Sequence, residues 1–257
     1  MKPYRLTYLL LGIAFVMVGI SFASRKATLQ TEKQKAESVR KDALQRQAEL
    51  RSTYPTVDFN ETETTDVNKR EIQRQRKLQH NNRGMVSDIP SPKDREVASY
   101  SHNQFDFPAL PFEKSDVVIL AAVLSAEAHM SQDKQAVYSE FEVQILEVFK
   151  ANDVKLIAGQ LWTVEREGGI VKYPNGQQIL YRRTNNGMLK VGERYVLFLQ
   201  RVPNADFYRV LTGYQCSLTG VTPLDYSPQF EVYRGFDEPS FLKTVRSSTS
   251  TQQQPKD

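Results

Sequence analysis

The sequence predicts a mainly β domain over residues 111–238, an antiparallel OB-like barrel or sandwich of about six to seven strands. Three observations favour this fold class. Short stretches of this region alternate apolar and polar residues, as strands with one buried and one wet face do. Dipeptides such as Gly-Gly, Asn-Gly and Pro-Asn separate these stretches. None of the segments between them shows the helical period.

A leader precedes this domain, and residues 1–24 are predicted to be a transmembrane anchor or a signal segment. No charged residue falls between Leu6 and Ala23, a run near the lower limit for crossing a bilayer. Small residues before Ser24 suit cleavage of a signal peptide, whereas the length of the run and Arg25 beyond it favour an uncleaved anchor. We therefore expect a single-pass inner-membrane protein, with secretion after signal cleavage as the alternative.

The segment between leader and domain divides in two. Residues 25–51 lack Gly and Pro and are rich in strong helix formers, which predicts a juxtamembrane helix. Apolar residues recur every seven positions, at Leu29, Ala36, Ala43 and Leu50. This spacing allows weak self-association through residues 25–50. Residues 52–110 lose periodicity and contain several prolines, so they are predicted to be a polar disordered tether.

A basic run lies within this tether. The chain has a formal net charge of +4, and residues 68–84 carry six Lys or Arg against Glu71 alone. Such a run can bind nucleic acid or anionic lipid. No aromatic residue interleaves with it for base stacking, so we interpret it as a solvated part of the tether.

The first strands of the domain are predicted from residue 115 onward. A stretch rich in Val, Ile, Leu and Ala begins there, and a second stretch at residues 136–150 alternates as far as residue 145. The alternation then slips, because Glu147 falls on the formerly apolar face, and a β-bulge explains such a slip. "LWTVERE", residues 161–167, is the third predicted strand.

Glycines dominate the next stretch, "EREGGIVKYPNGQQILYRRTNNG", residues 165–187. Phosphate loops place backbone N–H groups at a helix N-terminus, but Gly168 and Gly169 lead into the alternating residues "IVKY". We therefore predict a bend followed by a hairpin whose turn is "YPNGQ", with Gly176 at positive φ.

The C-terminal part of the domain shows the same pattern of short strands joined by turns. Residues 193–201 and 207–213 are predicted to form another hairpin, and residues 230–236 a last strand. Residues 239–257, rich in Ser, Thr and Gln, are predicted to be a disordered tail.

The segments "YSEFEVQILEVFK", "REGGIVKYPNGQQILYR" and "VGERYVLFL", with "LTGY" after them, resemble a family of exported or membrane-anchored bacterial proteins of unassigned function. The resemblance covers about residues 112–225 and leaves out the anchor and tether. It implies a bacterial origin and a C-terminal domain in the periplasm or outside the cell. It brings no catalytic or binding residues.

Few residues suit catalysis. His80 and His102 lie in the predicted tether, and His129 is the one histidine of the domain. Cys216 is the single cysteine, in a turn-like context, which argues against a Cys-based zinc site and against nucleophilic catalysis. We assign no catalytic residue, no metal ligand and no cofactor.

Two carboxylate pairs and one aromatic-basic group are the remaining candidates. Glu140/Glu142 and Glu165/Glu167 have the i, i+2 spacing of one sheet face, which suits a glycosidase-like or metal site, although solvent-facing strand positions explain them more simply. The candidate binding surface consists of Lys172, Tyr173, Tyr181, Arg182 and Arg183. Tyrosines there suit stacking on bases or sugars, and cross-strand packing is the alternative.

The sequence thus favours a membrane-tethered, non-enzymatic β-domain that binds an envelope protein or polysaccharide. A hydrolase with a carboxylate site is one alternative. A cytoplasmic nucleic-acid-binding OB-like barrel is another, and a location outside the cytoplasm disfavours nucleic acid.

Overall fold

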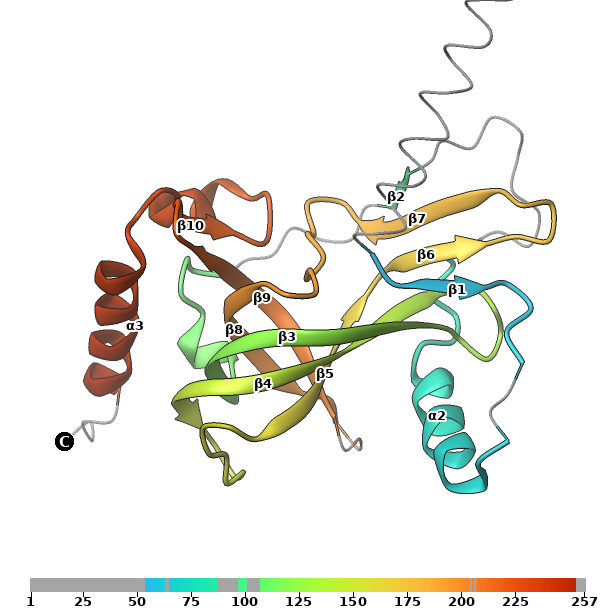
Figure 1. The fold of residues 1–257 in the computed structure, drawn as a ribbon, viewed down its shortest axis with the longest axis horizontal. Coiled ribbons are helices and arrows are strands. Elements are labelled where there is room, and N and C mark those ends of the chain that lie inside the picture. Colours follow the sequence, from blue (N-terminus) through green and yellow to red (C-terminus); the bar gives the residue numbers. More distant parts are fainter. Residues whose placement is uncertain are drawn as a thin grey trace, which may run out of the picture. The chain divides into compact units, whose positions relative to one another are not determined.

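The structure, a computed structural model, describes residues 54–62, 65–86, 97–100, 107–203, 205 and 207–252. The predicted anchor and juxtamembrane helix lie outside these residues. The described helices are all too short or too polar to cross a membrane. The fold is mainly β and contains two sheets, of four and six strands (Figure 1).

The larger sheet has the strand order β10-β9-β5-β4-β3-β8, and β8 also pairs with β9. Its strands are β3 (Val117–Met130), β4 (Val137–Ala151), β5 (Leu161–Glu167), β8 (Arg194–Arg201), β9 (Tyr208–Ser217) and β10 (Gly220–Pro223). All pairings are antiparallel except that of β5 with β9, which is parallel. The predicted hairpin at residues 193–213 is confirmed by the β8–β9 pairing.

The predicted bulge is confirmed in β4. Leu120 pairs with Glu147 while Ala121 pairs with Ile145, so Leu146 is the extra residue. A second register shift between Val118 and Ile119 leaves out Phe149 in the same way. The slip in alternation that the sequence shows is therefore a real distortion of the strand.

The smaller sheet has the order β1-β6-β7-β2. It consists of β1 (Thr56–Asp58), β6 (Gly169–Lys172), β7 (Gln178–Arg183) and β2 (Val97–Tyr100). β6 and β7 form the predicted antiparallel hairpin, while β1 and β2 pair parallel to its two edges. Gly176 in the turn has φ +84°, and a Cβ at Gly168 would lie 2.8 Å from the carbonyl oxygen of Tyr181. The bend and the turn therefore both require glycine.

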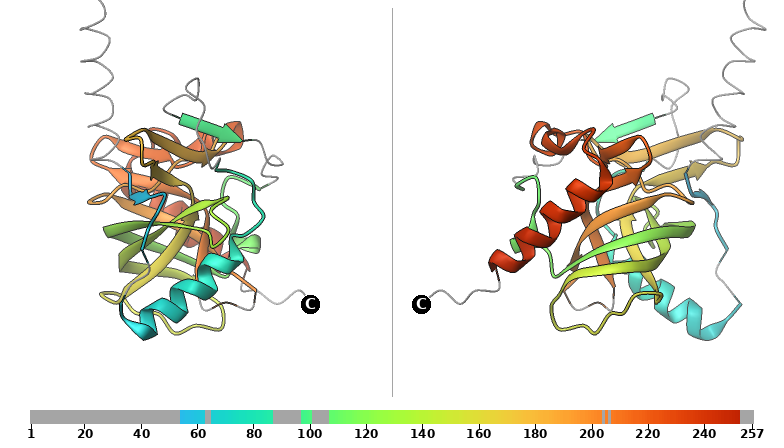
Figure 2. Two further views of the ribbon diagram at one scale, coloured as in Figure 1. Left: turned by 90° about the vertical axis from the view of Figure 1, so that its right-hand side faces the viewer. Right: turned by 60° about the vertical axis from the view of Figure 1, so that its left-hand side comes forward.

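Residues 117–121 of β3 and residues 195–199 of β8 are buried on both faces. Alternate residues of β3 enter different apolar clusters: Val117, Ile119 and Ala121 pack in one, and Val118 and Leu120 in another. Helix α3 (Glu238–Gln252) closes the second cluster with Phe241, Leu242 and Val245 (Figure 2, right). A third cluster joins the smaller sheet to the ends of β3 and β4, and includes Val57, Val137, Val171, Tyr173, Ile179 and Tyr181.

Three sequence predictions are corrected here. The predicted tether contains β1, helix α2 (Val67–Gln79) and β2, and the predicted disordered tail contains α3. Residues 230–236 are not a strand, because Pro228–Tyr233 forms the 3-10 helix η2, and β10 is the last strand. Residues 111–238 thus hold eight strands. The missed strands β1 and β2 are short and are stabilised by pairing with β6 and β7. The missed helices α2 and α3 are polar in composition and are stabilised by contacts with the larger sheet.

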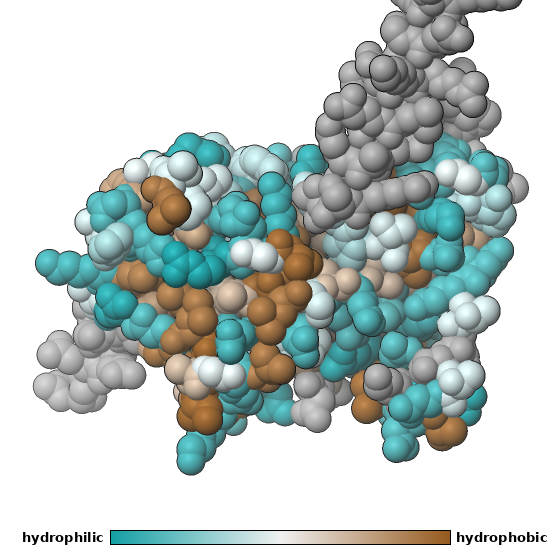
Figure 3. Space-filling view, viewed as in Figure 1, coloured by the Kyte–Doolittle hydropathy of each residue, from teal (hydrophilic) through white to brown (hydrophobic). Residues whose placement is uncertain are grey.

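Surface hydropathy differs across the domain. Figure 3 shows apolar residues gathered over the ends of β3 and β4 near α3, while hydrophilic residues dominate toward β6 and β7. Helix α2 lies on that hydrophilic side and runs in front of the larger sheet (Figure 2, left).

Candidate functional site

The predicted aromatic-basic surface does not form. Tyr173 and Tyr181 are only 2 % and 3 % exposed, and their hydroxyl oxygens lie 2.7 Å apart in a buried hydrogen bond. Phe59 stacks on Tyr173 with ring centroids 5.2 Å apart. These tyrosines face the core side of the smaller sheet, so they cannot stack on a base or a sugar.

The basic members of that group are dispersed. Lys172 is exposed, and its Nζ lies 3.2 Å from Oδ1 of Asp58. The guanidinium of Arg182 lies over the ring of Tyr226, and Arg183 forms an ion pair with Glu167. Strand alternation places Lys172 and Arg182 on the opposite face from the tyrosines, and Arg183, on the tyrosine face, is held by Glu167, so the group is not one surface.

The carboxylate pairs form a row across three strands instead. Glu127 of β3 is directly opposite Glu140 of β4, which is directly opposite Glu165 of β5. Glu167 lies on the same face of β5, two residues further on. Like charges at directly opposite positions destabilise a sheet, so this face needs cations from elsewhere in the chain.

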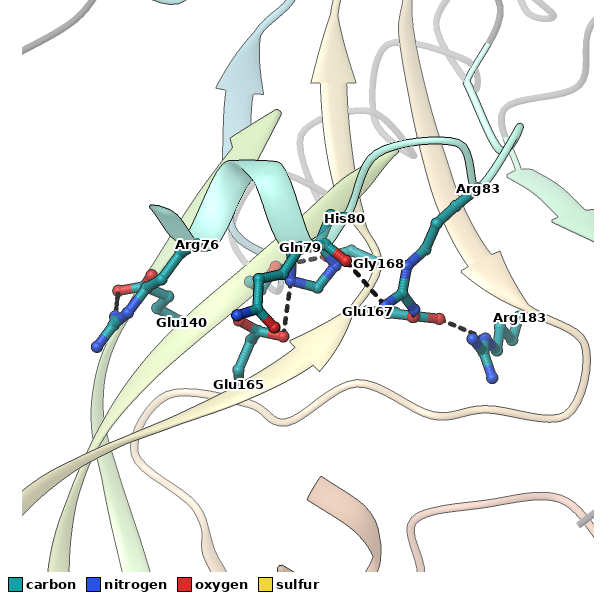
Figure 4. A network of polar contacts seen from close by, with 10 residues as sticks. Arg76, Gln79, His80, Arg83, Glu140, Glu165, Glu167, Gly168 and Arg183 are labelled. Atoms are coloured by element: carbon teal, nitrogen blue, oxygen red, sulfur yellow. Dashed lines mark hydrogen bonds and ion pairs between the residues drawn. The ribbon is translucent and has the colours of Figure 1, made fainter. Parts of the chain in front are cut away.

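Helix α2 and the turn after it supply the basic side chains. Nη1 of Arg76 lies 2.7 Å from Oε2 of Glu140, and Nε2 of His80 lies 2.9 Å from Oε1 of Glu165. Arg76 lies in the last turn of α2, and His80 directly follows the helix. Beyond the helix, Arg83 forms an ion pair with Glu167 (Figure 4).

Burial under α2 contradicts the solvent-facing interpretation of the second pair. Glu165 is 2 % exposed and Glu167 is 4 % exposed. His80, placed in the tether by the sequence, is 2 % exposed and stacks on Tyr138 with ring centroids 4.1 Å apart. An ionised carboxylate is buried at an acceptable free energy only when it is paired and hydrogen-bonded, and the basic run supplies that pairing.

A second contact fastens the same helix to the larger sheet. Glu61 accepts a hydrogen bond from Nζ of Lys77 at 2.7 Å, and its other oxygen lies 3.2 Å from Nδ1 of His129. Burial raises the pKa of Glu61, but the hydrogen bonds from His129 and Lys77 outweigh burial and the pKa is lowered overall. His129 is buried, with 4 % of its surface exposed.

The basic run thus pairs with three of the four carboxylates, Glu140, Glu165 and Glu167. From the sequence, the basic run was interpreted as a solvated part of the tether, and the carboxylates as solvent-facing strand positions. The available signal was the opposite charge of the two groups, but their spacing along the chain does not reveal that they meet.

Two grooves flank α2. One of about 490 Å³ lies between the helix and the open part of the acidic face. It is lined by Ile72, Gln73, Arg76, Ser125, Glu127, Glu140, Glu142 and Thr163. The other, about 480 Å³, lies toward β8 and is lined by Ile72, Gln75, Arg76, Gln79, Arg201, Ala205 and Phe207. Ile72, 55 % exposed, borders both grooves.

The second carboxylate pair and the thiol of Cys216 are buried. Glu165 and Glu167 are covered and paired, so neither faces a groove as a free acid or base. Burial raises the pKa of the Cys216 thiol to about 11, which keeps it protonated near neutral pH. No three His, Cys, Asp or Glu side chains of the described ranges are grouped to hold a metal ion.

No protein-family model matches the chain, and no curated protein is similar to it. The family resemblance stated above remains a prediction.

Proposed function

We propose that the chain is a membrane-tethered, non-enzymatic protein of the bacterial envelope whose OB-like barrel binds another envelope protein. The barrel is supported by the pairings, which run from β3 through β4, β5, β9 and β8 back to β3. In OB-folds the second and third strands carry the ligand-binding face. Here those strands are β4 and β5, which bear the acidic row.

Charge complementarity on that face is the observation that carries the proposal. The chain's own basic segment already binds there through Arg76, His80 and Arg83. Alongside it, Glu142 is exposed and makes no ion pair with any described residue, and Ile72 offers apolar surface. The groove of Glu142 and Ile72 therefore suits a protein segment that is both basic and apolar.

The other ligand classes receive less support from this geometry. Burial of Tyr173 and Tyr181 removes the stacking platform that favoured polysaccharide. An acidic face repels the phosphate backbone of nucleic acid. A carboxylate hydrolase requires a free acid and a free base on either side of a substrate, whereas Glu165 and Glu167 are both engaged in ion pairs.

Site-specific photo-crosslinking in the native host tests the proposal. A benzoyl-phenylalanine at Gln73, in the groove, is expected to give an adduct with an envelope protein. The same probe at Leu218, an exposed position outside both grooves, should not give this adduct. Glu142→Lys should abolish the adduct, and Glu113→Lys, at an exposed site away from the groove, should preserve it. Equal adducts from Gln73 and Leu218, or an adduct insensitive to Glu142→Lys, would contradict the proposal.

A further inference from the structure

Glu167 also lines a smaller cavity of about 200 Å³. Three arginines from three strands line it: Arg166 of β5, Arg183 of β7 and Arg209 of β9. Asn186 and Gln200 add polar groups. Figure 4 shows Glu167 between Arg83 and Arg183, so this one carboxylate contacts both the segment after α2 and an arginine of the cavity.

The three arginines differ in how they are neutralised. The charge of Arg166 is neutralised within the fold, because Arg166 forms an ion pair with Asp225. Its Nε also donates a hydrogen bond to the carbonyl oxygen of Gly187 at 2.6 Å. Arg183 shares the single carboxylate of Glu167 with Arg83. One carboxylate carries a single negative charge, so it cannot neutralise both guanidinium groups.

Arg209 is the residue whose charge lacks a partner. It is half-buried, and its side chain makes no hydrogen bond or ion pair with any described residue. Glu165 is directly opposite Arg209 in the β5–β9 pairing, but it is engaged with His80. Burial lowers the pKa of Arg209, Glu165 raises it, and the nearby Arg183 lowers it further.

Asn186 supplies an independent sign of a missing ligand. It is 5 % exposed, it lines the cavity, and its side-chain Oδ1 has no hydrogen-bond partner in the described part of the chain. A buried polar group without a partner is costly. Since the two ends of an Asn amide are assigned and not observed, a turned amide presents its NH₂ to the cavity as a donor.

We propose that this cavity binds a small oxyanion, the phosphate or carboxylate group of a ligand. Arg183 and Arg209 hold it by charge-assisted hydrogen bonds, and Asn186 makes a third polar contact. The volume is below that of a pocket for a whole drug-sized ligand, so the cavity takes a free anion or the anionic end of a larger molecule. This site is separate from the acidic groove of the proposed function and does not depend on it.

Isothermal titration of the full-length protein, at constant ionic strength, tests the proposal. The probes are inorganic phosphate, glycerol 3-phosphate and acetate, with chloride as the reference. We expect saturable binding of at least one oxyanion, with a Kd on the order of 1 mM or tighter. Preference for inorganic phosphate indicates a free anion, preference for glycerol 3-phosphate indicates a phosphate carried by a larger molecule, and preference for acetate indicates a carboxylate.

Matched arginine substitutions locate the binding. Arg209→Gln should weaken it at least about tenfold. Arg74→Gln removes the same charge from an exposed position of α2 and should leave it unchanged. Because Arg209 has no partner to lose, Arg209→Gln should not lower the unfolding temperature without ligand. If it does not fold, Arg209→Lys replaces it, with the same weakening expected. Absence of saturable binding by all three probes, or equal affinities of the Arg209 and Arg74 variants, would overturn the proposal.

Discussion

Nε2 of His80 lies 2.9 Å from Oε1 of Glu165, and the two side chains are only 3 % and 2 % exposed. This pair joins a helix outside the predicted β-domain to the middle of its larger sheet. With Arg76–Glu140 and Arg83–Glu167, it makes residues 65–86 an integral part of the domain.

His80→Ala tests that role. The substitution leaves Glu165 buried without its partner and removes the ring that stacks on Tyr138, so we expect a loss of about 3 kcal/mol or more in the free energy of unfolding. Gln75→Ala, at an exposed position of the same helix, should change it by less than about 0.5 kcal/mol. Urea unfolding measures both. Equal stability of the two variants would show that the pair is not structural.

Glu61 predicts a pH dependence. Its pKa is lowered in the folded protein, because the hydrogen bonds from His129 and Lys77 outweigh burial. A carboxyl with a lowered pKa adds stability above its unfolded pKa, and this contribution disappears as the pH falls through the folded value. The stability difference between wild type and Glu61→Gln should therefore be largest at neutral pH and shrink in acid. Urea titrations from about pH 3 to 7 measure this difference, with Glu113→Gln as the charge-matched control. A difference that grows in acid would contradict the assignment.

Gly187 is predicted to tolerate no side chain. A Cβ there would lie 1.9 Å from the carbonyl oxygen of Leu224, and the N–H of Gly187 donates to Asp225 at 3.0 Å. Gly187→Ala should cost about 3 kcal/mol or prevent folding. Gly176→Ala, at positive φ but in open space, should cost about 1 kcal/mol. Thermal unfolding followed by circular dichroism compares the two, and similar losses would argue against the close approach at Leu224.

The limits of the folding unit give a further prediction. From the alternation alone, residues 110–240 are expected to fold independently. In the structure, residues 54–86 provide the basic partners of Glu165 and Glu167, and Phe241 and Val245 of α3 are fully buried. Each apolar side chain removed costs about 1.5–3 kcal/mol. A fragment of residues 54–252 should therefore show a cooperative thermal transition that the 110–240 fragment lacks, and a cooperative transition in the shorter fragment would contradict this.

The predicted anchor lies outside the described residues and remains to be tested. If residues 1–24 span the bilayer uncleaved, the protein should stay in the membrane pellet after carbonate washing. Replacing Phe15 and Val16 by Arg adds about 5–7 kcal/mol against insertion, so that variant should remain in the cytoplasm. N-terminal sequencing of the mature protein provides the check: a first residue at Ser24 would show a cleaved signal instead.

The local features of the domain were predictable because they depend on neighbouring residues. Gly168, Gly169 and Gly176 marked the bend and the hairpin turn, and Glu147 marked the bulge. Alternation predicted which residues of β4 enter the core. These signals act within a few residues, so the sequence displays them directly.

Burial of charged and aromatic groups was decided by the tertiary structure. Glu165 in a strand and His80 in a polar segment each look solvated, and only their contact under α2 makes burial favourable for both. Likewise, residues 117–121 of β3 are buried on both faces, yet the polar composition of residues 238–252 did not identify α3 as the cover of one of them. Sequence by itself determined the turns and most strands of the domain, whereas the tertiary structure determined which distant segments cover them, because complementarity of charge and shape is a property of pairs.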